Sequence, residues 1–227
     1  MEFKEIQFTK EEGLELDNFK AMDYHAVENY GLPMELMMEN AGLQLANLVA
    51  SSAQKEDKIS IGVGNGNNGG GGLVAARRLA AWGYQVYLHT AMEITSALPV
   101  SQLERAIKFG AKMEFIETPD IWVDAYLGFS QRLPLPEELQ KLIVTFNNSK
   151  AFKVALDLPT GFLGDTSIPY FVPNQVITLA APKRILFALP DAVALYVGDL
   201  GIPAKVYDLF NARYLPFSES NILKIIR

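Results

Sequence analysis

The pattern of apolar and polar residues is helical in some segments and strand-like in others, and the two kinds of segment follow one another along the chain. A helical period is visible at residues 9–30, 34–51, 70–82, 100–109 and 137–146. Short apolar runs typical of strands are visible at residues 59–63, 85–89, 112–116, 121–127, 154–156, 176–179, 185–189 and 194–197. This alternation predicts an α/β fold in which helices cover both faces of a mostly parallel sheet, a three-layer sandwich.

Two of the predicted helices precede the first predicted strand. The break between them is Gly31-Leu32-Pro33, because glycine and proline interrupt a helix and proline can begin the next one. The second of these helices carries a broad apolar face. We expect both leading helices to pack around the sheet or against another subunit.

The composition is that of a protein with a full hydrophobic core. Hydrophobic residues make up 49% of the 227 residues and charged residues 20%, so the chain can bury enough apolar surface to fold. The length allows one large domain or two small ones. Because no linker-like segment divides the chain, we expect a single domain over residues 1–227.

Charge and cysteine content narrow the function. The net charge of −6 argues against nucleic acid as the main partner. The chain has no cysteine, which excludes disulfides and thiolate metal sites and agrees with a reducing cytoplasm. The first residues do not resemble a signal peptide, and no apolar run is long enough to span a membrane. We expect a cytoplasmic protein without a membrane partner.

A glycine-rich run over residues 62–72 joins a predicted strand to a predicted helix. Seven of its eleven residues are glycine, which lets the backbone approach a ligand closely, and the N-terminus of the following helix suits a phosphate. The run matches the dinucleotide fingerprint only formally, because no acidic residue ends the next strand, and Leu73 stands where a Walker A loop has lysine. We interpret the run as a nucleotide or phosphate site; the alternative is a tight turn whose glycines serve packing alone.

Two aspartates follow predicted strands at the edge where ligands bind in such sheets. Asp157 comes directly after an apolar strand and before a proline turn, so it could exchange a proton with a ligand or simply cap the turn. Asp124 could form an all-oxygen cation site together with Asn68 and Thr160. Separate hydrogen bonds without an ion explain those three residues equally well.

The two histidines are not part of any sequence motif that indicates a metal site or a catalytic site. His25 lies within the first predicted helix and His89 at the end of a predicted strand. Neither belongs to a spacing typical of a metal site or a catalytic triad. We interpret both as structural.

Six motifs follow one another in order between Met38 and Pro203, within a resemblance that covers about residues 9–210. They are Met38-Glu39-Asn40-Ala41-Gly42, Gly66-Asn67-Asn68-Gly69-Gly70 continued by Gly72-Leu73-Val74-Ala75-Ala76-Arg77, Val123-Asp124-Ala125, Asp157-Leu158-Pro159-Thr160-Gly161, Ala181-Pro182-Lys183-Arg184, and Gly198-Asp199-Leu200-Gly201-Ile202-Pro203. Together they resemble the YjeF N-terminal family, whose usual members are NAD(P)H-hydrate epimerases. An ordered set is far more specific than any single motif.

The resemblance implies a Rossmann-like fold, commonly a homodimer, and epimerisation of hydrated NADH or NADPH, NAD(P)HX, at C6 of the nicotinamide ring. It implies no second, dehydratase domain within these residues. By this resemblance Asp157 is the catalytic candidate, and a K⁺ ion is held by Asn68, Asp124 and Thr160. The residues expected to contact the nucleotide are Asn67, Asn68, Gly69, Gly70, Gly71, Gly128, Phe129, Ser130, Gln131 and Arg132.

Two ligand loops depart from the family pattern. Gly71 stands where members usually have aspartate, and Phe129-Ser130 stand where they usually have Thr-Gly. These changes remove a carboxylate and a hydroxyl and add a Cβ atom near the expected phosphate. They motivate an alternative function, a catalytically impaired member that acts as a nucleotide-binding or scaffold protein.

Overall fold

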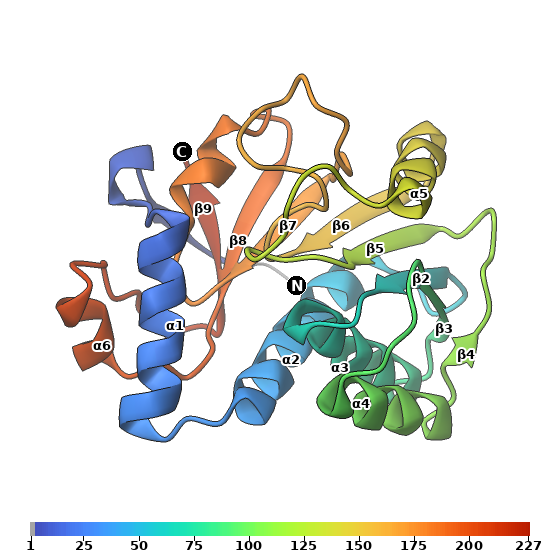
Figure 1. Cartoon of the computed structure of the whole chain (residues 1–227), viewed down its shortest axis with the longest axis horizontal. Coiled ribbons are helices and arrows are strands. Elements are labelled where there is room, and N and C mark those ends of the chain that lie inside the picture. Colours follow the sequence, from blue (N-terminus) through green and yellow to red (C-terminus); the bar gives the residue numbers. More distant parts are fainter. Residues whose placement is uncertain (1–2) are drawn as a thin grey trace.

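A nine-stranded, mostly parallel sheet forms the centre of the computed structural model, which describes residues 3–227 (Figure 1). The strand order is β1-β9-β8-β7-β6-β5-β2-β3-β4. Every neighbouring pair is parallel except β8 and β9. The strands are β1 (Lys4–Gln7), β2 (Lys58–Val63), β3 (Gln85–Thr90), β4 (Lys112–Met113), β5 (Ile121–Ala125), β6 (Phe152–Leu156), β7 (Gln175–Leu179), β8 (Ala194–Gly198) and β9 (Ile222–Ile226).

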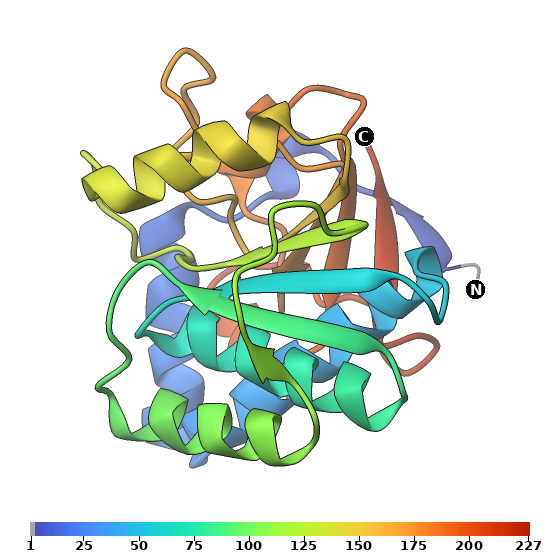
Figure 2. The same cartoon turned by 90° about the vertical axis from the view of Figure 1, so that its right-hand side faces the viewer.

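Helices cover both faces of this sheet, as the alternating pattern predicted. Helices α2, α3 and α4 lie on one face, and α5 lies on the other, which Figure 2 shows with α5 above the strands and α3 and α4 below. The helices are α1 (Leu16–Tyr30), α2 (Met34–Ser52), α3 (Asn67–Ala81), α4 (Ala97–Lys108), α5 (Glu137–Asn148) and α6 (Ala204–Leu209), with short 3₁₀ helices η1 (Lys10–Glu12) and η2 (Arg184–Ala188). The expected α/β three-layer architecture is confirmed. No helix of the described residues is long and apolar enough to cross a bilayer.

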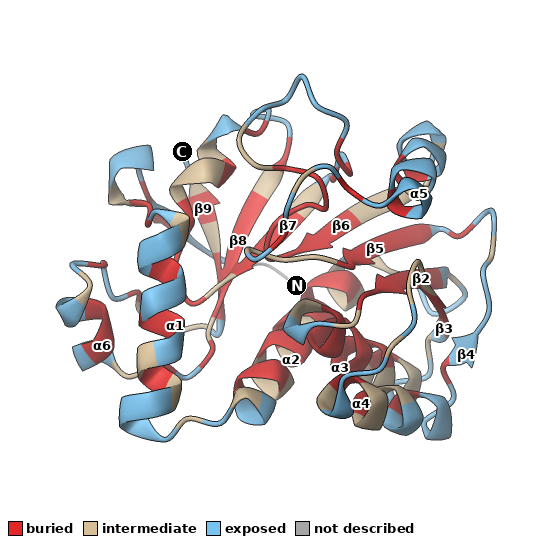
Figure 3. Cartoon of the chain, in the orientation of Figure 1, coloured by how far each residue is buried: buried red, intermediate tan, exposed pale blue. Residues whose placement is uncertain are grey.

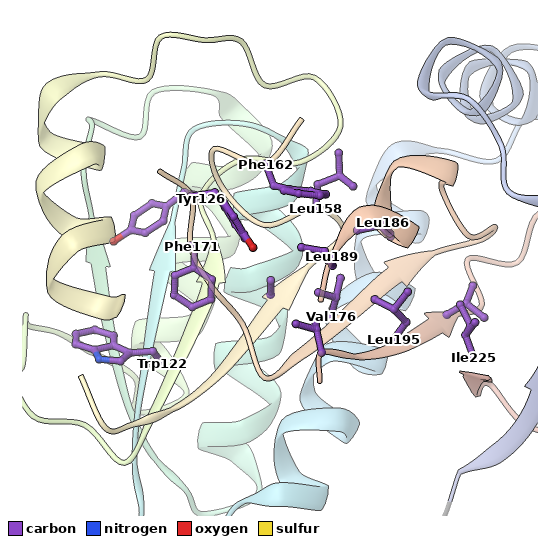
Figure 4. Packing of buried hydrophobic residues seen from close by; sticks show 14 of the residues in the cluster. Trp122, Tyr126, Leu158, Phe162, Phe171, Val176, Leu186, Leu189, Leu195 and Ile225 are labelled. Carbon is purple, nitrogen blue, oxygen red and sulfur yellow. The ribbon is translucent and has the colours of Figure 1, made fainter. Parts of the chain in front are cut away.

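Successive residues of β5 show how the sheet separates two cores. Trp122 packs toward α5, with its ring 4.5 Å from that of Phe146, whereas Ile121 and Val123 pack toward α2 and α3. All three are almost fully buried, because a central strand is covered on both faces and adjacent side chains point to opposite faces. Figure 3 shows the buried centre, and Figure 4 shows Trp122, Tyr126 and Phe171 in the α5-side cluster.

A third cluster joins the N-terminal helices to the end of the sheet. Phe19 and Met22 of α1 pack with Met37 of α2, with Val206 and Tyr207 of α6, and with the segments after β7 and β8. Helix α1 therefore packs beside the segments that follow β7 and β8, whereas α2 also covers one face of the sheet together with α3.

Several predicted elements differ from the structure. The helix expected over residues 9–30 is a 3₁₀ turn followed by α1, with Gly13 between them. The strand expected at 185–189 is wrong: these residues form most of η2. Strands β1 and β9 and helix α6 were not predicted. Because β1 and β9 pair with each other across more than 200 residues, local sequence gives no sign of that partnership.

The order of the central strands fixes where a ligand can bind. The chain runs from β2 outward to β3 and β4, and then returns to place β5 on the other side of β2. The chain therefore leaves the carboxyl ends of β2 and β5 toward opposite faces of the sheet. In open α/β sheets the place where neighbouring strands diverge in this way, the topological switch point, forms a crevice. The glycine-rich run follows β2, Asp124 lies near the carboxyl end of β5, and Asp157 follows β6; these three strands are neighbours in the sheet.

Candidate functional site

A pocket of about 340 Å³ opens at this switch point. The loops after β2, β5 and β6 form one wall, and α1 and the start of α2 form the other. Its lining residues are Phe19, Asp23, Tyr24, Met34, Met37, Met38, Ala41, Gly66, Asn67, Asn68, Tyr126, Leu127, Gly128, Phe129, Ser130, Gln131, Leu156, Asp157, Leu179 and Leu200. The pocket is mostly apolar with a few polar groups, which is usual for a small-molecule site.

Asp157 lies directly after β6 and faces the pocket. Its backbone has φ of 66°, a left-handed conformation that is uncommon for residues other than glycine and tolerated best by Asn and Asp. The backbone N–H of Phe129 donates to its Oδ2 (3.1 Å), and Lys183 Nζ donates to its Oδ1 (2.5 Å). Strained backbone over-determined by such contacts is typical of a functional position.

Lys183 is fully buried beneath Asp157. Its Nζ also donates to Thr178 Oγ1 (3.0 Å) and to the Leu179 carbonyl (3.1 Å), and it lies 3.4 Å from the centre of the Phe19 ring. Burial lowers the pKa of this ammonium group, and the charge of Asp157 opposes that shift. A buried lysine with a carboxylate, two oxygens and an aromatic face around it is held in one position.

Asp23 is a second buried acid of the pocket, and sequence analysis missed it. It lies on α1, is 6% exposed, and lines the pocket. No hydrogen bond involves its carboxyl group within residues 3–227. Burial raises the pKa of Asp23 to about 6; the charge of Lys183 opposes the shift and that of Asp157 adds to it. Its position gave no signal in the sequence beyond an acidic residue on the buried face of a helix.

Asp124 and Thr160 are in direct contact below the pocket. The Thr160 hydroxyl donates to Asp124 Oδ1 and the Thr160 N–H to Oδ2, both at 2.7 Å. Burial raises the pKa of Asp124 to about 6, while the hydrogen bonds from Thr160 oppose the shift. No cationic side chain pairs with Asp124 among the described residues, so its charge is balanced only by N–H and O–H dipoles.

Asn68 lies beside Gly128, on the same side as Asp157, and forms no hydrogen bond with Asp124 or Thr160. A Cβ atom added to Gly128 would lie 3.1 Å from both Asn68 Oδ1 and Asp157 Oδ2, so the two oxygens flank that glycine. The Nδ2 atom of Asn68 is buried without a partner among the described residues. A buried, unsatisfied amide is costly in a folded protein and therefore indicates a missing ligand.

The glycine-rich run is mostly helix rather than loop. Helix α3 begins at Asn67, so the residues from Gly69 to Gly72 are buried within its first two turns. A Cβ atom at Gly69 would lie 1.9 Å from the Gly64 carbonyl oxygen. The glycines thus serve close packing between α3 and the turn after β2, while Asn67 and Asn68 occupy the N-terminal turn that faces the pocket. Close packing therefore explains the buried glycines, and the prediction of a nucleotide or phosphate site rests on Asn67 and Asn68.

The two departures from the family pattern have different consequences. Phe129 holds Asp157 through its backbone N–H, so this contact does not depend on the side chain at position 129. Its ring instead packs edge-to-face against Phe19 at 5.3 Å. A Cβ atom at Gly71 would point between Leu156 and Ala41, two residues of the pocket wall, so a carboxylate there would stand at that wall.

The structure brings most of the predicted ligand residues to one pocket. Asn67, Asn68, Gly128, Phe129, Ser130, Gln131 and Asp157 line it. Gly69, Gly70 and Gly71 lie behind the wall in α3, and Arg132 is exposed outside it. Within residues 3–227 no three His, Cys, Asp or Glu side chains cluster as a metal site.

His89 lies on the other face of the sheet, among Trp122, Phe115 and Phe146. The Tyr126 hydroxyl and His89 Nδ1 share a hydrogen bond (2.6 Å), and His89 Nε2 is buried without a partner among the described residues. Burial lowers the pKa of His89 to about 4. This placement agrees with a structural role.

The buried His89 should make the protein acid-sensitive. Because the folded-state pKa lies below the unfolded value of about 6.5, the unfolded chain binds more protons between pH 6.5 and 4. Stability should therefore fall by about 3 kcal/mol as pH drops through this range. Urea unfolding at pH 7, 5.5 and 4 would measure the loss, and His89→Phe should reduce it, with His25→Gln as the control. An equally steep loss in His89→Phe would contradict this assignment.

Comparison with known proteins agrees with the fold and with the family resemblance. The family profile described as YjeF-related protein N-terminus matches residues 34–185. An NAD(P)H-hydrate epimerase from Rhodopirellula baltica is 31% identical over 85% of this chain and 85% of its own length. A bifunctional NAD(P)H-hydrate repair enzyme from Thermofilum pendens is 31% identical over 85% of this chain.

The yeast protein YNL200c, known from a crystal structure, has the same fold, with a TM-score of 0.84 and 23% identity over 93% of this chain and 99% of its own. The chain spans 41% of the length of the Thermofilum relative. The chain belongs to the YjeF N-terminal family.

Proposed function

We propose that this protein is an NAD(P)H-hydrate epimerase, an isomerase that inverts C6 of the hydrated nicotinamide ring. The observation that carries the proposal is the Asp157–Lys183 ion pair. Lys183 holds the Asp157 carboxylate in position, and Asp157 lines the pocket at the switch point of the sheet. Epimerisation at C6 requires a group that takes or gives a proton beside the ring. Asp157 faces the pocket and is the group best placed for it.

The remaining contacts suggest how the nucleotide lies. The N-terminal turn of α3, with Asn67 and Asn68, offers free N–H groups and a positive dipole end to a phosphate. The loop from Gly128 to Gln131 forms the neighbouring wall. Met37 and Met38 of α2 supply apolar surface for a ring. The nicotinamide end would then lie toward Asp157 and the phosphates toward Asn67.

A K⁺ ion held by Asn68, Asp124 and Thr160 is part of the proposal. The donor set is all oxygen, which suits a hard cation. The buried Asp124 without a cationic side-chain partner among the described residues favours such an ion, to which Asn68 would contribute its Oδ1. When bound, K⁺ would supply positive charge that organises the ligand loops, while Asp157 and its neighbours act on the ring.

Potassium should therefore stabilise the protein. At K⁺ about 100-fold above its dissociation constant, binding to the folded state alone would add about 2.7 kcal/mol, or roughly 5–10 °C in melting temperature for a chain of this size. Thermal unfolding in KCl and in choline chloride of equal ionic strength measures it. Asp124→Asn should lose the response and the exposed Asp165→Asn should keep it. A response unchanged in Asp124→Asn would exclude this ion site.

The test of the epimerase function is an assay on the separated epimers of NADHX and NADPHX. Chiral chromatography should show interconversion well above the spontaneous rate measured without protein. The alternative, a binding or scaffold protein motivated by Gly71 and Phe129, predicts that NAD⁺ binds without any such acceleration. Saturable binding with no turnover would favour that alternative and reject the enzyme.

Two further properties are proposed from the family resemblance. We infer a homodimer, which light scattering of the purified protein tests, with a mass near 50 kDa expected from the 25.1 kDa chain. We also infer a cytoplasmic location, because the chain has no cysteine and nicotinamide nucleotides serve metabolism there. Fractionation of expressing cells tests the location.

A further inference from the structure

Two buried carboxyl groups line the pocket from different elements, those of Asp157 and Asp23. The function proposed above uses only Asp157. Asp157 follows β6, whereas Asp23 projects from α1, so the two reach the pocket from different walls. Asp157 has three hydrogen-bond partners and a salt bridge. Asp23 is buried to a similar degree and has no hydrogen-bond partner within residues 3–227.

A largely buried carboxyl group without a hydrogen-bond donor is costly to ionise, and the side of Asp23 that remains open is the pocket. Nothing in the packing of α1 requires an acid here, because the neighbouring buried positions Phe19, Met22 and Ala26 are apolar. The charge of Lys183 acts on both Asp157 and Asp23, but among the described residues it forms an ion pair with Asp157. Asp23 therefore has no cationic partner of its own, which favours its protonated form over its ionised form.

We propose that Asp23 is the second proton-transfer group of the site and that it works with Asp157 on opposite faces of the ring. The proposal rests on the epimerase function proposed above. Two acids with different surroundings are the usual means of supplying an acid and a base at one pH. An epimerase has particular need of this pair, because it must act on both faces of one carbon atom.

The reaction balances with water as the only co-reactant. The Asp23 carboxyl group gives its proton to the C6 hydroxyl. The C6–O bond then breaks, and the electron pair of that bond leaves with the water molecule. The N1 lone pair forms an N1=C6 double bond. Water then adds to the other face of C6, the electron pair returns to N1, and the Asp157 carboxylate takes the released proton. Asp23 is then ionised and Asp157 protonated, the state needed for the reverse direction. Proton exchange with solvent restores the starting protonation of both groups.

Asp23→Asn tests the proposal because the substitution keeps the shape of the side chain and removes its proton chemistry. We expect the epimerisation rate to fall by about 10²-fold or more, while the dissociation constant of NAD⁺ changes by less than about threefold. Asp23→Glu should restore part of the rate. Asp17→Asn, on an exposed position of the same helix, is the matched control and should leave the rate unchanged.

A stability measurement separates this role from a structural one. The charged groups that face Asp23 are Lys183 and Asp157. The pKa of Asp23 is higher in the folded protein than in the unfolded chain, so folding disfavours the ionised carboxylate. The protein should therefore lose stability as pH rises from about 4 through 6. Asp23→Asn should therefore melt at a higher temperature than the natural protein at pH 8 and show less advantage at pH 4.5. A structural acid would give the opposite result, a lower melting temperature with the lost rate.

The outcomes of the rate assay are distinct. If the natural protein does not accelerate epimerisation, the proposed function fails and this step fails with it. If the natural protein is active and Asp23→Asn is equally active, only the role of Asp23 is overturned. Reaction in ¹⁸O-labelled water should place ¹⁸O on C6 of the inverted product at each turnover, and inversion without label would overturn the water-loss step.

Discussion

Asp157→Asn should lower the rate of NAD(P)HX epimerisation by about 10²- to 10⁴-fold, the range usual for loss of a general acid–base group. Asparagine has nearly the same shape and tolerates the left-handed backbone found at this position. Its amide can still accept a hydrogen bond from Lys183 but cannot take up a proton. The substitution therefore removes the chemistry and preserves the geometry of the pocket.

The assay needs a control for changes in the surrounding loop. Asp165→Asn alters an exposed aspartate in the loop after Asp157, whose carboxylate accepts hydrogen bonds from Ser167, and should retain the full rate. Near-equal binding of NAD⁺ to Asp157→Asn would show that the pocket persists. Full activity in Asp157→Asn would remove Asp157 from the mechanism and leave Asp23 as the acid to test next.

The parts of the site that sequence analysis predicted share one property. Asp124, Asp157 and the glycine-rich run each follow an apolar segment with clear strand character. Parallel topology then places the ends of such segments at one edge, so their meeting was predictable without knowledge of any contact. Asn67 and Asn68 were predictable for the same reason, as the turn between a strand and a helix.

The parts that were missed depend on long-range packing. Asp23 is one of several acids in its helix, and only the docking of α1 against the pocket distinguishes it. Lys183 belongs to a motif recognised in the sequence, but its burial under Asp157 depends on β7 lying next to β6. The apolar residues 185–189 fit a strand equally well by composition, and tertiary packing decides in favour of the 3₁₀ helix η2.

Lys183→Met should destabilise the fold by about 3–5 kcal/mol, because it leaves a buried carboxylate without its partner. Methionine fills a similar volume, so the loss of packing is small. The charge of Asp157 would remain in a pocket wall with Asp23 nearby and no cation between them. Urea unfolding at pH 7.5 measures the loss, with the exposed Lys141→Met as the control for removal of a lysine.

The double variant Lys183→Met/Asp157→Asn decides whether the loss comes from the pair. Removal of both charges leaves neither group uncompensated, so the double variant should recover a large part of the stability that Lys183→Met loses. It should remain inactive, because both the proton-transfer group and its anchor are gone. A double variant at least as unstable as the sum of the single variants would mean that Lys183 stabilises the fold through Thr178, Leu179 and Phe19 alone. Recovery of stability without activity is the result expected if this buried pair is kept for the chemistry of the site at a cost to the fold.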